Sequence, residues 1–362
     1  MKKVIFISAL AIAAAVSCTK SDIVDTKFNE QIGFEAYIGR DAQTKASVVD
    51  ASNIGTAGIY GFYTGANPWA TTSKANLWVN DPLDCEEGTV EPAKFWTNEN
   101  DQYSFLAYAP KDEDSIVVPE PNEEGNVVNP AITYTVDPSI PAQIDLTYAV
   151  VENITKAKVD VITGEGAGKV PMTFKHALAR LTVNASKSTT EENFDFIVKK
   201  ITITGGFITS DALTLKTGLW AKNGTPATVN ATTPATTYTF YDVPTNKTQL
   251  TTTATKYAEH VMDGELPDNY LMMIPVNFAS QKASVHVEYT TVYEGEESTT
   301  NEADFDVTTN FEQGKAYAIN LVFSKKTETI EFYVTVDKWE EGTVGADGKN
   351  PQHQDKDIVD GE

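Results

Sequence analysis

Short runs in which apolar and polar side chains alternate recur along the whole chain, and turn-forming Gly, Pro, Asn and Asp separate them. An alternation with a period of two places successive side chains on opposite faces of an extended strand. Such runs occupy residues 32–38, 57–64, 93–98, 103–110, 132–137, 144–150, 194–205, 212–217, 236–244, 269–278, 283–293, 304–311, 316–323 and 329–339. Many short strands joined by turns predict an all-β protein made of antiparallel, Greek-key sandwiches.

Helical periodicity is rare, and only residues 177–181 and 256–262 could form a turn or two of helix. The clearest internal break is the glycine-rich segment 163–171, TGEGAGKVP, which precedes a new strand-like start. A chain of 362 residues is long enough for two domains, each with its own core. We therefore predict an N-terminal β-sandwich domain over residues 30–168 and a C-terminal one over residues 169–340.

The N-terminus has the organisation of a secretory signal. Two lysines, Lys2 and Lys3, precede an apolar stretch of about 13 residues that ends at Val16. This stretch is too short to span a bilayer, which takes about 20 residues. The first cysteine of the chain, Cys18, stands where bacterial lipoprotein signals carry the lipidated cysteine, although Ala15 replaces the usual leucine of that motif.

We therefore expect residues 1–18 to be a lipoprotein signal with a lipidated Cys18, which would anchor the mature chain to a membrane. Residues 19–29 are polar and are expected to form a tether. Cys85 then has no cysteine partner, so the domains should be stable without disulfides. The C-terminal residues 341–362 are polar, charged and aperiodic, and we expect them to be disordered.

The charge balance argues against a nucleic-acid partner. Lys and Arg total 28 against 51 Asp and Glu, which gives a net charge of -23. Such a surface repels phosphate backbones.

No constellation of catalytic or cofactor-binding residues is visible. The TGEGAGK stretch resembles a phosphate-binding loop, but Thr163 and Val170 stand where the Walker pattern needs Gly and Ser or Thr. The four histidines lack metal-ligand spacing, and His176 is better explained as a core or boundary residue with a hydrogen-bond partner. No G-x-S-x-G motif occurs. We expect no enzyme activity, no metal and no cofactor.

A second class of function stays open because the chain is rich in aromatic residues. Four tryptophans could stack on sugar rings if they were exposed: Trp69, Trp78, Trp96 and Trp220. Aromatic side chains in a sandwich more often belong to the core. The alternative is thus a lipid-anchored glycan-binding protein of the outer membrane surface.

Three stretches, taken in order, resemble the fimbrillin family of Bacteroidia. The first is IGFEAYIGR followed by QTKAS and AGIYGFYT, and the second is FWTNENDQYSFLAYAP. The third is MTFKHALARLTVNA, with Phe174, His176 and Leu181, and a closing VDKW at Trp339 fits the last strand of the family. The resemblance implies two tandem transthyretin-like β-sandwich domains in a pilin that supports adhesion. It also implies a lipoprotein precursor that reaches the outer membrane and then joins a fimbria on the cell surface.

The resemblance further implies a route of assembly. A trypsin-like protease cuts after a basic residue behind the first strand, which then leaves with the anchor. The vacated groove accepts a strand from another fimbrial subunit, by β-augmentation. The apolar face of the first strand here consists of Ile32, Phe34, Ala36 and Ile38.

Arg40 is the candidate processing site. It is one of only two arginines and follows the first strand directly, in a loop of small and polar residues that a protease could engage. Lys45 is the alternative basic residue of the same loop, whereas Arg180 lies inside an apolar pattern. An ordinary exposed loop arginine is the competing interpretation.

The donor strand and one modification are weaker predictions. The run 329–339 alternates as a donor must, and its apolar residues are Ile330, Phe332, Val334 and Val336. If its own domain needs this run, the subunit could be a tip, an anchor or a non-polymerising relative. Ser115, in Asp-Ser-Ile, looks like the O-glycosylation pattern of these bacteria.

Overall fold

The chain is almost entirely β-strand in the computed structural model. The structure describes residues 30–38, 54–111, 113–164, 166–188, 194–230, 233–257, 270–325, 329–338 and 349–357. Within these ranges the helices are the five-residue α1 (Lys156–Asp160) and a short 3-10 turn, η2 (Ile140–Ala142). The predicted all-β fold class with few short helices is confirmed. Among the same residues, no helix has the length and apolar character needed to cross a bilayer.

A seven-stranded sheet organises the N-terminal part. Its order is β1 (Phe34–Ile38), β9 (Val170–His176), β8 (Thr147–Ile154), β5 (Gln102–Ala109), β2 (Thr56–Gly65), β3 (Trp78–Asp84) and β4 (Thr89–Val90). All neighbours are antiparallel except β1 and β9, which are parallel. Both faces of the sheet are covered, so β2 and β5 are buried along most of their length. Burial on both faces explains why the sequences of these strands, AGIYGFYT and YSFLAYAP, are apolar almost throughout.

A four-stranded sheet covers one face of that sheet. Its order is β13 (Leu219–Trp220), β12 (Ser210–Thr214), β7 (Ala131–Thr135) and β6 (Ile116–Val117). Strand β7 comes from the N-terminal half of the chain and β12 from the C-terminal half, and five residue pairs join them. Tyr134 of β7 belongs to the same buried cluster as Tyr60 of β2 and Ile203 in the C-terminal half. The core is therefore continuous between the two halves.

Two larger sheets make up the C-terminal part. One contains β15 (Thr255–Tyr257), β10 (Ala179–Lys187), β22 (Lys315–Ser324), β23 (Thr329–Lys338) and β24 (Lys349–Asp357) in that order, with β16 (Leu271–Met273) also on β10. The other contains β14 (Thr236–Asp242), β11 (Phe194–Gly205), β18 (Ala283–Tyr293) and β19 (Glu296–Glu297), with β20 (Asn301–Val307) on β18. A separate pair joins β17 (Val276–Asn277) to β21 (Asn310–Phe311). Phe196 and Phe323 from the two sheets meet with their ring centroids 5.3 Å apart.

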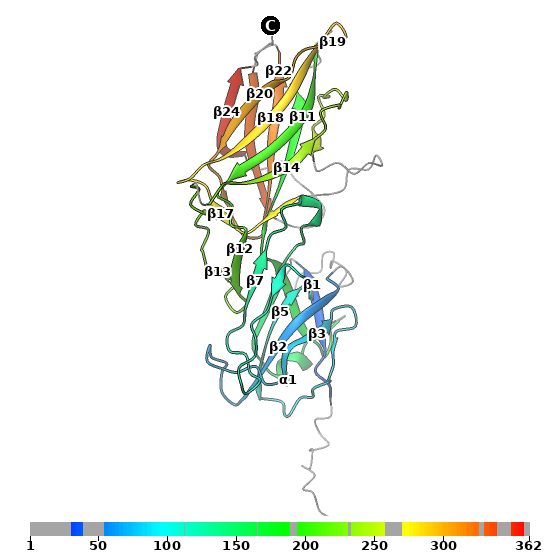
Figure 1. Ribbon diagram of the computed structural model, residues 1–362. Coiled ribbons are helices and arrows are strands. Elements are labelled where there is room, and N and C mark those ends of the chain that lie inside the picture. Colours follow the sequence, from blue (N-terminus) through cyan, green and yellow to red (C-terminus); the bar gives the residue numbers. More distant parts are fainter. Residues whose placement is uncertain are drawn as a thin grey trace, which may run out of the picture.

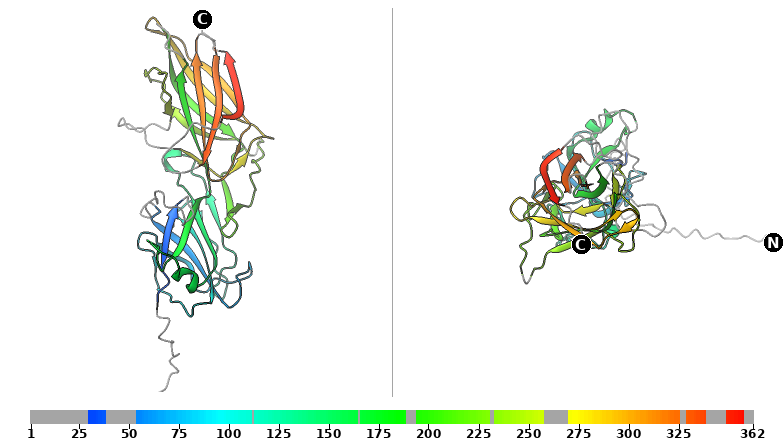
Figure 2. Two further views of the ribbon diagram at one scale, coloured as in Figure 1. Left: turned by 180° about the vertical axis from the view of Figure 1, so that it is seen from behind. Right: turned by 90° about the horizontal axis from the view of Figure 1, so that it is seen from above.

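The molecule is elongated, with two β-rich bodies along its length (Figures 1 and 2). Strands β1, β2, β3 and β5 lie in one body, and β11, β14, β18, β20, β22 and β24 lie in the other (Figure 1). Strands β7, β12 and β13 lie beside the first body, near the end that faces the second (Figure 1).

The predicted domain boundary needs correction. We expected the C-terminal domain to begin at residue 169, but strand β9 belongs to the seven-stranded sheet. Its buried residues Val170, Met172 and Phe174 fill the core beside β1. The chain passes to the next sheet only at Ala177 and Leu178, before β10 begins. The glycine-rich segment is thus a loop inside the N-terminal body, because a Gly-rich break marks a turn and does not say which sheet the next strand joins.

The two predicted helical turns also need correction. Residues 179–181 are strand, since a short apolar run buried on both faces has no period that separates helix from strand. Lys256 lies in β15, and residues 258–262 lie outside the described part of the chain. The helix that does form, α1, is capped by Thr155, whose hydroxyl accepts from the Lys158 amide at 3.3 Å. Five residues are too few for an amphipathic pattern.

The predicted disordered tail, residues 341–362, is ordered in part. Residues 349–357 form β24, antiparallel to β23 with a register shift between Tyr333 and Thr335. Strand pairing uses backbone groups and needs no apolar alternation, so a polar segment can occupy a sheet edge. Pro351 is tolerated there because edge strands and bulges accommodate a missing amide donor.

A cluster of opposite charges supports the C-terminal body. The Lys199 side chain is only 6% exposed, and its ammonium lies 2.6 Å from Oε1 of Glu297. Lys247 also pairs with Glu297, and the Thr290 hydroxyl donates to it at 2.7 Å. Hydrogen bonds from Lys199, Lys247 and Thr290 lower the pKa of Glu297 from its ordinary 4.5 to about 2.

Because the folded pKa lies below the unfolded one, Glu297 stabilises the protein above about pH 4.5, and this contribution is lost as the pH falls towards 2. We predict that Glu297→Gln lowers the free energy of unfolding by about 2 kcal/mol at neutral pH, since it leaves the charge of buried Lys199 without its carboxylate. Denaturant unfolding between pH 7 and pH 3 should show that the gap to wild type narrows on acidification. The exposed neighbour Glu296→Gln is the control, and an equal effect of both variants would contradict the assignment.

Candidate functional site: the groove of the first strand

Strand β1 is bonded on both of its edges. On one side it runs parallel to β9, with Phe34 opposite Val170 and Ile38 opposite Phe174. On the other side it meets the segment that follows β3. There the Phe34 amide donates to the Gly88 carbonyl at 2.9 Å, and the Ile32 amide donates to the Lys94 carbonyl at 2.8 Å. The first strand is thus inserted between two segments of one body (Figure 1).

The inward face of the first strand is part of the core. Ile32, Phe34 and Ala36 are at most 2% exposed, and Ile38 is half-buried, so the alternation read from the sequence gives the buried face. The Phe34 ring packs edge-on against Trp78 at 5.8 Å and Phe105 at 5.0 Å between centroids. Burial of a side chain such as Ile32 or Phe34 contributes about 2 kcal/mol. Without this strand the body would have an open apolar groove, lined by β9 and by Trp78 and Phe105.

Two ion pairs hold the outward side of the segment. The Lys169 ammonium lies 3.0 Å from Glu35, and that of Lys156 on α1 lies 2.8 Å from Glu30. Lys156 also contacts Asp160 at 2.6 Å. Burial acts to lower the pKa of Lys156, but hydrogen bonds to Asp160 and Glu30 outweigh it and the pKa is raised. Lys156 therefore stays charged at neutral pH, and each of the two lysines contacts a carboxylate of the segment that contains the first strand.

The predicted lipidation and processing residues lie outside the described part of the chain. Cys18 precedes residue 30, and Arg40 and Lys45 fall in the interval 39–53 between β1 and β2. The other arginine, Arg180, lies in β10 with its guanidinium 4.5 Å from the centre of the Tyr270 ring.

The predicted donor run is engaged in its own body. Ile330, Phe332 and Val334 are fully buried, and Val336 packs against the same core. Strand β23 lies between β22 and β24, so both of its edges are paired. These side chains would have to be extracted before they could enter another groove.

The four tryptophans singled out from the sequence, all within the described residues, form no platform for sugars. Trp78 and Trp96 are 1% exposed, and Trp69 and Trp220 are 6% exposed. The indole nitrogen of Trp78 donates to the Pro92 carbonyl at 2.9 Å. None of these four side chains is therefore exposed for stacking on a sugar ring, which was the reason for considering a glycan-binding function.

Other residues singled out from the sequence have structural roles. His176 is 7% exposed and its Nδ1 lies 2.6 Å from Asp145, as expected for a boundary histidine with a partner. Cys85 is a buried free thiol, and burial raises its pKa to about 12. Ser115 is half-buried, and its carbonyl accepts from the Thr135 amide at 2.8 Å.

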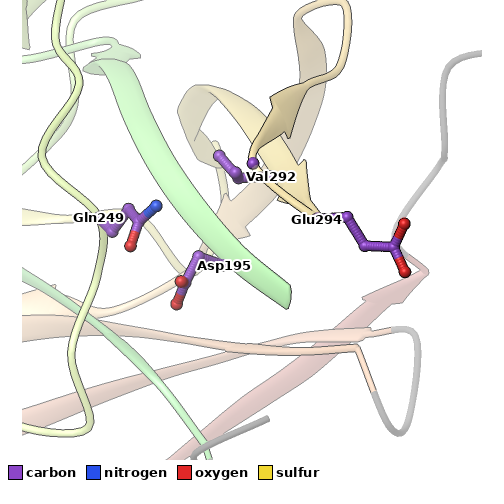
Figure 3. Close-up of a pocket in the computed structure, with 5 residues that line it drawn as sticks. Asp195, Gln249, Val292 and Glu294 are labelled. Atoms are coloured by element: carbon purple, nitrogen blue, oxygen red, sulfur yellow. The ribbon is translucent and has the colours of Figure 1, made fainter. Parts of the chain in front are cut away.

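An open pocket lies at the far end of the C-terminal body (Figure 3). It is lined by Asp195, Gln249, Val292, Glu294 and Gly295. Asp195 is already paired with Lys187. Among the described residues, no group of three or more His, Cys, Asp or Glu side chains could hold a metal ion. We find no catalytic or cofactor-binding arrangement in this pocket.

Sequence and structure comparisons place the chain among known proteins. The profile of a family described as fimbrillin-like matches residues 44–339. A fimbrial protein from Bacteroides vulgatus is similar in structure, with a TM-score of 0.61 at 16% identity, over 86% of this chain and all of that chain. The fimbrial anchor protein Mfa2 from Porphyromonas gingivalis is similar over 85% of this chain and 98% of that chain, at 12% identity. Its TM-score of 0.36 is too low to support an argument about details.

A search of curated proteins found no match. The similarity to the Bacteroides vulgatus protein supports the fold alone, because the identity is low. The family profile covers most of the chain, including every strand from β2 to β23. We conclude that the chain belongs to the fimbrillin-like family, a family of fimbrial and adhesin-like surface proteins and not of enzymes.

Proposed function

We propose that this protein is a structural subunit of a cell-surface fimbria, assembled by protease-triggered strand exchange. In this proposal it is exported as an outer membrane lipoprotein precursor with a lipid on Cys18. Cleavage after Arg40, or after Lys45, then separates the first strand from the rest of the chain. The observation that carries the proposal is that residues 32–38 contribute three buried side chains and are hydrogen-bonded on both sides, yet β1 connects to β2 only through residues 39–55.

The physical argument concerns what the first strand leaves behind. Its loss would expose apolar pockets beside Trp78 and Phe105 together with unpaired backbone groups on β9 and near Gly88. Exposed strand edges of this kind recruit another strand. A strand from a neighbouring subunit would restore both the apolar contacts and the hydrogen bonds. Such a contact is heterologous, and a heterologous contact propagates into a filament where the rotation between subunits does not close.

The described C-terminal strands support the acceptor role better than the donor role. The apolar run in β23 completes its own core, and β24 has the sequence KNPQHQDKD, without apolar alternation. Other fimbrial subunits are therefore the partners we propose for the groove.

The fit between strand and groove is close at Gly88. A Cβ atom on this residue would lie 1.9 Å from the Phe34 carbonyl oxygen, and its φ is +73°. Any strand that occupies the groove with this geometry needs glycine here, because both the left-handed backbone and the approach of the strand exclude a side chain.

Limited proteolysis tests the proposed processing. We predict that a trypsin-like protease converts the purified protein into a form whose N-terminus is Asp41 or Ala46, and that this form takes up a fluorescent peptide with the sequence of residues 31–38 because the groove becomes available. N-terminal sequencing measures the cut, and size-exclusion chromatography measures whether the peptide elutes with the protein. The double variant Arg40→Gln with Lys45→Gln should stay uncut and take up no peptide. A wild-type loop that resists the protease, or a cut form that takes up no peptide, would contradict the proposal.

Substitution of Gly88 tests the groove itself. Gly88→Ala should lose about 1 kcal/mol through its positive φ and at least about 2 kcal/mol more through the clash with Phe34. The matched control is Gly125→Ala, because Gly125 has a φ of +75° and no atom within 4 Å of its Cβ position. Denaturant unfolding should separate the two variants, and faster cleavage of Gly88→Ala between β1 and β2 would show that the first strand is loosened. Equal stability of the two variants would count against a tightly fitted strand.

A further inference from the structure

The outward face of the first strand is also contacted by the rest of the N-terminal body. Glu35 and Tyr37 alternate with the buried residues of β1 and point away from the core. The Lys169 ammonium lies 3.0 Å from the Glu35 carboxylate, and the two side chains are 36% and 21% exposed. This ion pair is thus shielded from solvent in part and screened less than a fully exposed pair.

The loop before β9 lies directly over this outward face. A Cβ atom on Gly166 would lie 2.8 Å from the Tyr37 hydroxyl oxygen and 3.6 Å from Cγ of Glu35. Gly166 therefore leaves room for both outward side chains. The segment that resembled a phosphate-binding loop has a different role here, since its lysine pairs with a carboxylate of the first strand.

One backbone hydrogen bond positions Lys169 independently of the first strand, because its amide donates to the Gly166 carbonyl at 3.1 Å. The amide of the next residue, Val170, donates to the Gly33 carbonyl at 2.8 Å, a bond that an incoming strand would restore. Lys169 directly precedes β9, whose last two residues, Lys175 and His176, pair with β8. The pairing with β8 and the bond to Gly166 do not involve the first strand, and they hold the Lys169 ammonium beside the groove when the Glu35 carboxylate departs.

We propose that Lys169 selects the incoming strand by its charge. The preferred strand carries a carboxylate at the position of Glu35, between the two residues that replace Phe34 and Ala36 in the groove. A strand with lysine or arginine at this position is rejected by like-charge repulsion. This inference rests on the proposed function, because it concerns the occupant of the same groove. It adds the chemistry of the partner, which is an apolar strand with an acidic residue on its outward face.

The net charge of the chain favours selection by a single local charge. The whole chain carries a net charge of -23, so two copies or two similarly acidic subunits repel each other at long range. A fixed lysine beside the groove provides an attraction that acts only when a strand is docked in the correct register. A shift of one residue would turn the acidic side chain towards the core.

Peptide binding to the cleaved full chain tests the proposal. The probe is a fluorescent peptide with the sequence of residues 31–38, QIGFEAYI, and its two variants carry Glu35→Gln or Glu35→Lys. For the wild-type protein we expect the Gln peptide to bind about three- to fivefold more weakly and the Lys peptide at least about tenfold more weakly. High salt should reduce both differences.

A reciprocal charge exchange provides the decisive comparison. The protein variant Lys169→Glu should prefer the Lys peptide over the Glu peptide. Because this change could weaken the precursor, the double variant Glu35→Lys with Lys169→Glu, which keeps an ion pair in the uncut chain, is tested beside it. The control is Lys282→Glu, which reverses the charge of a lysine paired with Asp306 at 2.5 Å in the C-terminal body. It should keep the wild-type order of peptides.

The outcomes separate this inference from the proposed function. If all three peptides bind the wild-type protein equally, the groove accepts a strand but Lys169 does not select it, and the inference is overturned. The same holds if Lys169→Glu keeps the wild-type order. If no peptide binds the cleaved protein at all, both the strand-exchange function and the charge rule are wrong.

Discussion

The insertion of β1 between β9 and the segment around Gly88 is the contact on which the N-terminal body depends. It supplies the ring of Phe34 to the core and satisfies backbone groups on both neighbours. No disulfide is available to replace it, because Cys85 is a free thiol. The end strand of the seven-stranded sheet thus completes the core beside Trp78 and Phe105 and contributes directly to the stability of this body.

The chain order explains why this segment is separable. Glu35 and its partner Lys169 are 134 residues apart in sequence, and β1 runs parallel to β9. Closing such a long loop costs more conformational entropy than forming a local pair such as β2 and β3. The strands β8, β5, β2, β3 and β4 pair with one another in a register to which β1 contributes no residue. Removal and replacement of β1 are then compatible with an intact neighbouring sheet.

Much of the fold follows from local patterns in the sequence. Alternation predicted β2, β5, β7 and the buried face of β1, and the half-apolar setting of His176 predicted a partner, which is Asp145. Sheet membership was not predictable in the same way, since nothing local in VPMTFKH says that β9 pairs with β1. The polar strand β24 and the capped helix α1 lack any periodic signal. The Glu35–Lys169 ion pair joins residues that no spacing rule connects, whereas the burial of the four tryptophans agrees with the usual place of aromatic side chains in a sandwich.

The pairing of β7 with β12 has a consequence for the order in which the two bodies can be completed. Strand β12 follows β11 of the C-terminal body, yet it pairs with β7 in the sheet that covers the seven-stranded sheet. Five residue pairs join the two strands, from Ser210 opposite Thr135 to Thr214 opposite Ala131. The buried face around Tyr134 is therefore closed by a segment that the chain supplies only after it has entered the C-terminal body. The two bodies are interleaved in sequence, so residues 30–176 on their own would lack β12 and its buried Leu213.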